Sequence, residues 1–230
     1  FLRNPGNGAF EDISTQVGID TVALYGFQVV VWDLDGDGWL DLFVANDSQP
    51  NLLWRNRAGE RFEDVAFQSG AALSMNGKPQ ASMGVAFGDY DQDLLPDLYV
   101  TNFAEDYNTL YKGTPGNAFR DVTTRLNLAT PTLPLVGWGA GFDDFDSDGD
   151  LDLYAVHGHI YPQVDELELG TSYAQPCILL ENLGDGRLQA PELGAGPGFL
   201  ESRASRGSAV GDYDNDGDLD ILGGVLDGPP

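Results

Sequence analysis

The chain has 230 residues, of which 37 are Asp or Glu and 11 are Lys or Arg, so its formal net charge at pH 7 is −26. This charge excludes a nucleic-acid binder that works through phosphate contacts, because two polyanions repel each other. Hydrophobic residues make up 42% of the chain, which is enough to bury a core, and the 30 glycines and 13 prolines favour many turns and few long helices.

The start of the chain and its cysteine content carry less information. No stretch approaches the about 20 apolar residues of a membrane-spanning helix. The chain opens with Phe-Leu-Arg-Asn, without an initiator Met or a signal-peptide pattern, so we expect a processed chain or a piece of a longer one. Cys177 is the single cysteine, and it cannot form a disulfide within the chain.

Short β-favouring runs follow one another from the first residue. Residues 1–4 and 9–13 read FLRN and AFEDI, and they match LWRN at 53–56 and RFEDV at 61–65. The later pair is preceded by two more such runs, FQVVVW and LFVAN, which completes a set of four. Runs this short and this rich in Val, Phe and Leu are typical of strands.

An acidic nine-residue unit joins the first and second runs of each set, and it occurs four times. It reads DLDGDGWLD at 33–41, DYDQDLLPD at 89–97, DFDSDGDLD at 144–152 and DYDNDGDLD at 212–220. The starts at 33, 89, 144 and 212 are therefore 56, 55 and 68 residues apart. Four strands repeated at a period of tens of residues indicate the blades of a β-propeller, whereas a β-sandwich would lack this period.

We therefore predict an all-β fold, a β-propeller of four-stranded antiparallel blades with about four blades in this chain. It would be a single propeller domain or propeller segment over 1–230. Its predicted parts are a half-blade at 1–13, blades at about 26–65, 84–122 and 137–190, and a half-blade at 207–226. The two half-blades leave three arrangements open: a closed four-bladed ring, head-to-tail pairing between molecules into an oligomer or filament, or a fragment of a larger ring.

The acidic units predict calcium-binding hairpin loops. Carboxylates at positions 1, 3, 5 and 9 of a tightly curled loop can converge on one point, and position 7 can offer its backbone carbonyl. Such a set of oxygens suits Ca²⁺, whereas Mg²⁺ prefers strict octahedral geometry and retains its waters. Aspartates are common in solvated turns, but four carboxylates within nine residues repel one another unless a cation is bound.

Up to four Ca²⁺ ions are expected, one for each loop. The second loop is the weakest candidate, because Leu94 stands where the other three have glycine and that position needs a sharp turn. The predicted ligands are Asp33, Asp35, Asp37, Asp41 and the Trp39 carbonyl; Asp89, Asp91, Asp93, Asp97 and the Leu95 carbonyl; Asp144, Asp146, Asp148, Asp152 and the Asp150 carbonyl; and Asp212, Asp214, Asp216, Asp220 and the Asp218 carbonyl.

Several strings of the chain resemble a known family. GVAFGDYD at 84–91 resembles the FG-GAP or VCBS repeat of integrin α-subunit propellers. SRGSAVGDYDNDGDLDILGGVLDGPP at 205–230 and GHIYPQVDELELGTSY at 158–173 look like the ASPIC/UnbV group, the bacterial relatives of cartilage acidic protein. The resemblance implies a calcium-binding propeller that is secreted or located in the cell envelope, with a ring of seven or eight blades and no established catalytic residues.

Three further residues are candidates for other roles. His157 and His159 begin an insertion at about 157–175 that accounts for most of the longer spacing. They could act as ligands or acid/base groups, but a loop whose imidazoles bond to the backbone is the simpler interpretation, and such insertions commonly form binding surfaces. Asn46 begins an Asn-Asp-Ser sequence, which is the pattern of an N-glycosylation site.

The sequence thus predicts a non-catalytic, calcium-binding, extracellular or envelope-located module with a structural or adhesive role. Its expected partners are other copies of itself, through the half-blades, or an extracellular protein or glycan, and they include neither nucleic acid nor a membrane span. A carbohydrate-binding propeller is the first alternative. A calcium-dependent polysaccharide-cleaving enzyme is the second and weaker one, because the sequence offers no identifiable acid–base pair.

Overall fold

The structure is a computed structural model that describes residues 1–167, 169–192, 194–226 and 228, so Glu168 of the predicted insertion lies outside the described residues. Its strands form five antiparallel sheets within this part of the chain. The first sheet has two strands, β1 (Leu2–Arg3) and β2 (Glu11–Asp12). The last also has two, β15 (Ser205–Gly211) and β16 (Asp220–Val225).

Three four-stranded sheets lie between these two-stranded sheets, and each takes its strands in chain order. We call them the first, second and third blades. The first blade contains β3 (Gly26–Trp32), β4 (Asp41–Asn46), β5 (Leu52–Arg57) and β6 (Arg61–Asp64). The second contains β7 (Ser82–Gly88), β8 (Asp97–Asn102), β9 (Thr109–Thr114) and β10 (Ala118–Asp121). The third contains β11 (Gly137–Asp143), β12 (Asp152–His157), β13 (Ile178–Asn182) and β14 (Leu188–Gln189).

The helices of the described residues are short; the α-helices lie in the connections between sheets, and the 3-10 helix lies between β12 and β13 of the third blade. They are α1 (Ser14–Val17), α2 (Ala66–Ser69), α3 (Ala129–Thr132), the 3-10 helix η1 (Pro162–Glu166) and α4 (Pro197–Leu200). None of the described helices is long and apolar enough to cross a membrane. The predicted all-β fold built from four-stranded antiparallel blades is therefore confirmed.

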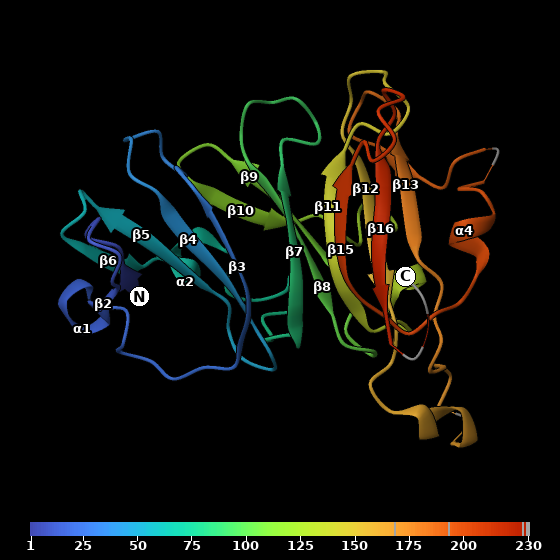
Figure 1. Cartoon of the computed structure of the whole chain (residues 1–230), viewed down its shortest axis with the longest axis horizontal. Helices are drawn as coiled ribbons and strands as arrows, with labels where there is room; N and C mark the ends of the chain where they lie inside the picture. Colours follow the sequence, from blue (N-terminus) through green and yellow to red (C-terminus); the bar gives the residue numbers. More distant parts are fainter. Residues whose placement is uncertain (168, 193, 227, 229–230) are drawn as a thin grey trace.

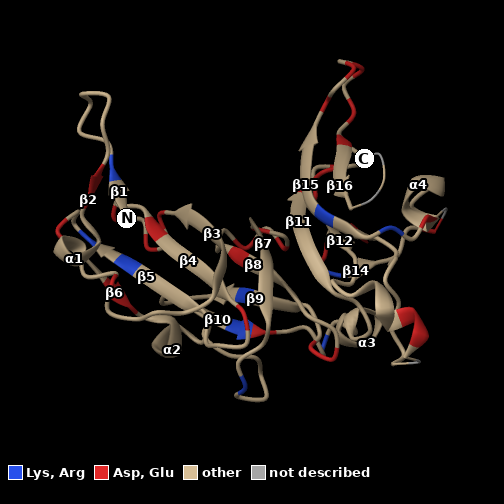
Figure 2. Cartoon of the chain, turned by 60° about the horizontal axis from the view of Figure 1, so that its bottom comes forward, with Lys and Arg blue, Asp and Glu red and all other residues tan. Residues whose placement is uncertain are grey.

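The blades stand side by side in an open arc (Figure 1). The first strands β3, β7, β11 and β15 are neighbours in that order, so they form the inner row of the arc. Both views place the N-terminal sheet and the C-terminal sheet at opposite ends of the molecule (Figures 1 and 2). The chain does not close on itself into a four-bladed ring, which removes the first of the three arrangements left open by the sequence.

The inner strands approach one another closely. A Cβ atom on Gly84 of β7 would overlap with the carbonyl oxygen of Trp138 on β11, so only glycine fits at this position. In the first blade, Gln28 joins the strands in another way: its side-chain amide donates to the Val85 carbonyl oxygen (3.2 Å) and accepts from the Val85 N–H (2.9 Å). The inner strands are therefore joined by a close backbone approach at Gly84 and by side-chain-to-backbone hydrogen bonds from Gln28.

The core lies between neighbouring blades rather than within one sheet. One cluster fills the space between the first and second blades, and it includes the fully buried Phe43 and Leu53. A second cluster fills the space between the second and third blades and includes Leu110 and Leu153. Each blade thus buries its apolar face against the next one, which is how repeat proteins of this kind gain their stability.

Candidate metal centres

Each of the four acidic units forms the hairpin between the first and second strands of its sheet. Residue 9 of the unit begins the second strand and pairs with the residue just before the loop, as in the pairs Trp32 with Asp41 and Gly211 with Asp220. Figure 2 marks acidic residues in red on the hairpin between β15 and β16, at the edge of the molecule. The strands therefore present each loop in the same way.

Three carboxylates converge in every loop. In each group one oxygen from every residue lies within 4.8 Å of the others, close enough for one cation to bridge them. The groups are Asp33, Asp35 and Asp37; Asp89, Asp91 and Asp97; Asp144, Asp146 and Asp152; and Asp212, Asp214 and Asp220. The structure thus brings together 12 of the predicted aspartates, while Asp41, Asp93, Asp148 and Asp216 stand outside these groups.

The first aspartate of each unit curls the loop by accepting two backbone N–H groups. In the third loop, Asp144 accepts from the N–H groups of Asp148 (3.1 Å) and Gly149 (3.0 Å). In the second loop, Asp89 accepts in the same way from Asp93 (3.1 Å) and Leu94 (2.8 Å). These bonds turn positions 1 to 6 around the point where the carboxylates meet.

The curl requires positive φ angles at two positions. Position 6 has φ of 89° at Gly38, 94° at Gly149 and 101° at Gly217, and Leu94 is held at 66°. This strained leucine is expected from the sequence. Position 4 is not, although three non-glycine residues also lie at positive φ there: Gln92 at 56°, Ser147 at 61° and Asn215 at 60°. Asn in particular tolerates positive φ, so a turn-favouring residue at position 4 is the sequence signal for this conformation.

The ninth aspartate ties the loop to the third strand of its blade. Asp97 is fully buried, and its two oxygens accept the Tyr90 N–H of the loop (3.0 Å) and the Gly113 N–H of β9 (2.7 Å). Burial raises the pKa of Asp97 to about 7 and is also the main cause of a raised pKa at Asp41 and Asp152. Burial disfavours the ionised form of such a carboxylate, and a cation bound beside it would stabilise that form.

A side chain on the third strand adds a partner that the sequence analysis missed. The Arg55 guanidinium on β5 contacts Asp35 in the first loop, and the Lys112 ammonium on β9 contacts Asp91 and Asp93 in the second (2.8 Å to Asp93). These residues occupy the same repeat position, as NLLWRN and NTLYKG align at 51–56 and 108–113. The predicted ligand at position 3 is therefore also an ion-pair acceptor in both blades.

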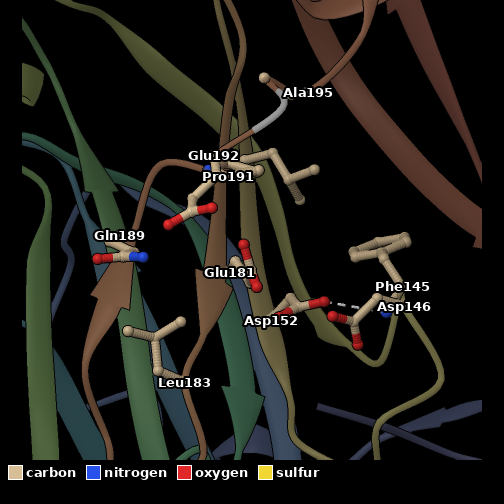
Figure 3. A pocket seen from close by; sticks show the side chains of 11 residues that line it. Phe145, Asp146, Asp152, Glu181, Leu183, Gln189, Pro191, Glu192 and Ala195 are labelled. Atoms are coloured by element: carbon tan, nitrogen blue, oxygen red, sulfur yellow. Dashed lines mark hydrogen bonds between the residues drawn. The ribbon is translucent and has the colours of Figure 1, made fainter.

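The third blade has Glu181 at that repeat position, because CILLEN at 177–182 aligns with the same strand. Glu181 lines a cavity of about 550 Å³ beside the third loop, together with Asp146, Asp152 and Glu192. Figure 3 shows these side chains around one hollow, with Glu181 close to Asp152. The third loop therefore lies in a more acidic setting than the first two.

The donor set fits a hard cation. Asp91 Oδ1 lies buried, and no donor in the described part of the chain bonds to it. Carboxylate oxygens gathered this closely, with one left without a donor, match the chemistry of a Ca²⁺ site. Asp89, Asp91 and Asp97 would hold the ion in the second loop, and the corresponding residues would hold it in the third and fourth loops. In the first loop, Asp33, Asp35 and Asp37 would hold it.

Both histidines are engaged in the structure. His157 is fully buried, with Nδ1 3.1 Å from the Pro176 carbonyl oxygen and Nε2 3.2 Å from the Asn108 amide nitrogen. Burial lowers the pKa of His157 to about 4, so its ring is neutral at pH 7. His159 accepts the Tyr161 N–H on Nδ1 (3.1 Å), and neither histidine belongs to a potential metal-binding group of the described residues.

The possible glycosylation sequence is placed unfavourably. The Asn46 side chain is buried, and its amide nitrogen donates to the Pro50 carbonyl oxygen (2.8 Å). A glycan attached to that nitrogen would need this bond broken and the side chain brought to the surface.

Comparisons with known proteins agree with this geometry. The model of the FG-GAP-like repeat matches residues 33–100 and 89–155, which is more than half of the chain. The chain therefore belongs to the FG-GAP-like repeat family, and the resemblance seen in the sequence is confirmed.

The chain is also similar to cartilage acidic protein 1 of three species. Cartilage acidic protein 1 of Xenopus tropicalis is 32% identical over 175 residues, which cover 70% of this chain and 25% of the relative. Cartilage acidic protein 1 of Mus musculus and of Homo sapiens are each 28% identical over 169 residues, with the same coverage. This chain thus spans about a quarter of the length of these relatives.

Proposed function

We propose that this chain is a non-catalytic, calcium-binding propeller module of an extracellular protein with a structural or adhesive role. The convergence of three carboxylates in each of four equivalent loops is the observation that carries the proposal. Membership of the FG-GAP-like family and similarity to cartilage acidic protein 1 support the extracellular setting.

Charge repulsion explains why a cation would matter for stability. Of the 37 acidic residues, 18 lie in the four nine-residue loops. One Ca²⁺ in each loop would bring the formal charge from −26 to −18. An ion that binds only the folded state stabilises it by mass action, about 2.7 kcal/mol per site at a free concentration 100 times the dissociation constant.

Calcium binding is tested by thermal unfolding and by titration calorimetry of the full chain. We expect addition of a calcium chelator to lower the melting temperature by more than 10 °C, because several sites are emptied at once. The matched variants are Asp144→Asn, which removes a loop ligand, and Glu201→Gln, which removes an exposed acid outside the loops. Asp144→Asn should reduce the number of bound ions by one, whereas Glu201→Gln should leave it unchanged.

A clear result would contradict the proposal. A melting temperature that does not respond to chelator, together with no heat of calcium binding, would show that the loops are solvated turns. Equal stabilisation by Mg²⁺ at the same concentration would contradict the choice of metal, because the proposal relies on a flexible loop that satisfies the larger ion.

A carbohydrate-binding role is the second candidate. A groove of about 350 Å³ runs over the inner strands and is lined by Phe27, Met83, Trp138 and Arg206. Aromatic faces beside a concave surface suit stacking on sugar rings, but Arg206 already covers the Trp138 ring at 4.5 Å. A glycan array probed in the presence of calcium tests this role, and the absence of any bound glycan would remove it. Cleavage of a polysaccharide has less support, since both histidines are already engaged within the fold.

A further inference from the structure

The first and second acidic loops each lie against one basic side chain of their own blade. The Arg55 guanidinium contacts Asp35 in the first loop, and the Lys112 ammonium contacts Asp91 in the second. The side chain of Asp35 is only 4% exposed and that of Lys112 is 27% exposed, so water screens these pairs less than it screens a fully exposed pair. Both loops therefore hold a positive charge that is covalently part of the chain.

The carboxylates that these basic side chains contact are also predicted calcium ligands. Asp35 and Asp91 are the third residues of their loops, and each belongs to the group of carboxylates that converge there. Lys112 also contacts the predicted ligand Asp93, with Nζ 2.8 Å from Oδ2, while Oδ1 of Asp93 accepts the Leu95 N–H. A calcium ion and the ammonium group would thus attract the same carboxylates, and the ion would gain Oδ2 of Asp93 only as Lys112 moves away.

The third loop has an acidic residue where the first two have a basic one. Glu181 occupies the repeat position of Arg55 and Lys112 and lines the cavity beside the loop. None of the ion pairs among the described residues involves Glu181 or an aspartate of the third loop. The Gln92 side chain of the second loop donates to Asp150, but its amide is neutral. Within the part of the chain that the structure describes, the third loop therefore has no tethered positive charge.

The local charges of the three loops differ accordingly. The first and second loops contain four aspartates each, and Arg55 or Lys112 changes the local formal charge from −4 to −3. The third loop contains five aspartates, and Glu181 changes its local charge from −5 to −6. Carboxylates this close to one another repel, and an added cation offsets the repulsion most where the charge is most negative. The third loop thus gains more from a bound cation than the other two.

We propose that Arg55 and Lys112 are tethered counter-cations, and that calcium consequently fills the third loop at a lower concentration than the first and second loops. The inference rests on the proposed calcium-binding function and adds an order of filling among the three complete blades. Without calcium, the first two loops keep part of their charge neutralised, whereas the third loop is the first to loosen. The chain then responds to rising calcium in two steps, of which the first stabilises the third blade.

Three amides report the order of filling in the NMR spectrum of one sample. The N–H groups of Gly38, Leu94 and Gly149 each bond to the first aspartate of their own loop. In a calcium titration of the full chain, the Gly149 signal should reach its midpoint at a concentration about 10-fold lower than the other two. Equal midpoints, or a Gly149 signal that responds last, overturn the order of filling and leave calcium binding intact. If none of the three signals responds, the calcium-binding function fails together with this inference.

Exchanging the charges between the two blades tests the cause of the order. Lys112→Glu gives the second blade the residue of the third, and it should lower the calcium midpoint of Leu94 about 10-fold. Glu181→Lys makes the reverse exchange and should raise the midpoint of Gly149 about 10-fold. Both shifts should shrink at high salt, because the side chains are partly solvated.

Matched controls separate the local charge from the net charge of the chain. Lys78→Glu and Glu201→Lys change the net charge by the same amounts, at exposed positions outside the loops. Both controls should leave the calcium midpoints of the three amides in place. Midpoints that move as far in the controls as in the loop variants would show that only the net charge acts, which contradicts the role of the tethered residues.

Thermal unfolding separates this role from ordinary packing. In chelator, Lys112→Glu should lower the melting temperature by about 2–4 °C, because the second loop loses its tethered charge. The same variant should gain more than the wild-type chain on addition of saturating calcium, and Glu181→Lys should show both effects with the opposite sign. The loss of a packing contact alone would lower the melting temperature equally in both conditions and leave the calcium midpoint unchanged. That result for Lys112→Glu overturns the proposal.

Discussion

The second and third blades share one scaffold, and three of the repeat positions at which they differ bear on stability and on the charge beside the loop. Both have the same loop spacing, the same curl and a buried ninth aspartate bonded to the third strand. These three pairs are Leu94 and Gly149, Lys112 and Glu181, and Asn102 and His157. The repeat therefore preserves the groups that shape the loop, while the charge beside the loop and the residue at the end of the second strand are free to change.

The residue at the end of the second strand gives the largest expected difference in stability between the two blades. His157 is buried and neutral, and its pKa of about 4 lies below the ordinary value of 6.5. As the pH falls, the unfolded chain therefore binds a proton at a higher pH than the folded chain does. The contribution of His157 to the free energy of unfolding is fully present above pH 6.5 and is lost as the pH falls toward 4. The shift corresponds to a loss of up to about 3 kcal/mol.

Urea unfolding between pH 4 and 7.5 measures this effect in the wild-type chain and in His157→Asn. The variant gives the third blade the residue that the second blade has at Asn102, and its stability should depend less on pH over this range. The difference between the two chains isolates the histidine from the carboxylates that both contain. Parallel curves would show that His157 does not carry the pH dependence.

The sixth loop position gives the next largest difference. Leu94 is held at φ 66°, where a side chain costs about 1–2 kcal/mol, whereas Gly149 takes φ 94° without that cost. Leu94→Gly should therefore raise the free energy of unfolding by about 1 kcal/mol. Gly149→Leu should lower it by a similar amount. Denaturant midpoints measured in chelator test both without interference from the metal.

The calcium response of the same variants sharpens the comparison. If strain at position 6 weakens the second site, Leu94→Gly should also raise its calcium affinity. A destabilising effect of Leu94→Gly would mean that the exposed leucine side chain makes a contact worth more than its strain.

Much of the fold and of the candidate metal sites could be predicted from the sequence, because the information is local and repeated. The four copies of the acidic unit gave the hairpins, and the match of 1–4 with 53–56 gave the partial blade at the start of the chain. The strained Leu94 followed from comparing copies. Each of these inferences compares a residue with its own repeat equivalent, so no knowledge of distant contacts was needed.

Features that depend on distant segments could not be predicted in this way. Lys112 reaches the loop from 15 residues beyond Asp97, outside the repeated nine-residue unit, so the pattern of the unit does not indicate this contact. His157 is held by Asn108, which comes from a neighbouring blade, and by Pro176, which directly follows the insertion. The open arc depends on how sheets pack, and no short sequence pattern encodes that curvature.

The charge beside the loop gives the smallest expected effect. Lys112 lies against the second loop, where it competes with a cation for Asp91 and Asp93. Lys112→Gln should raise the calcium affinity of that loop about threefold, and Glu181→Gln should lower the affinity of the third loop about threefold. Both changes are modest because these side chains are partly solvated, and both should shrink at high salt.

Two amides report the loops separately in the NMR spectrum of one sample. The Leu94 N–H bonds to Asp89 and the Gly149 N–H bonds to Asp144, so each amide signal should follow calcium binding in its own loop. Lys112→Gln should shift the titration of Leu94 and leave that of Gly149 in place, and Glu181→Gln should do the reverse. If both amides move together in either variant, the loops are coupled through the blades and the local charge does not set their affinities.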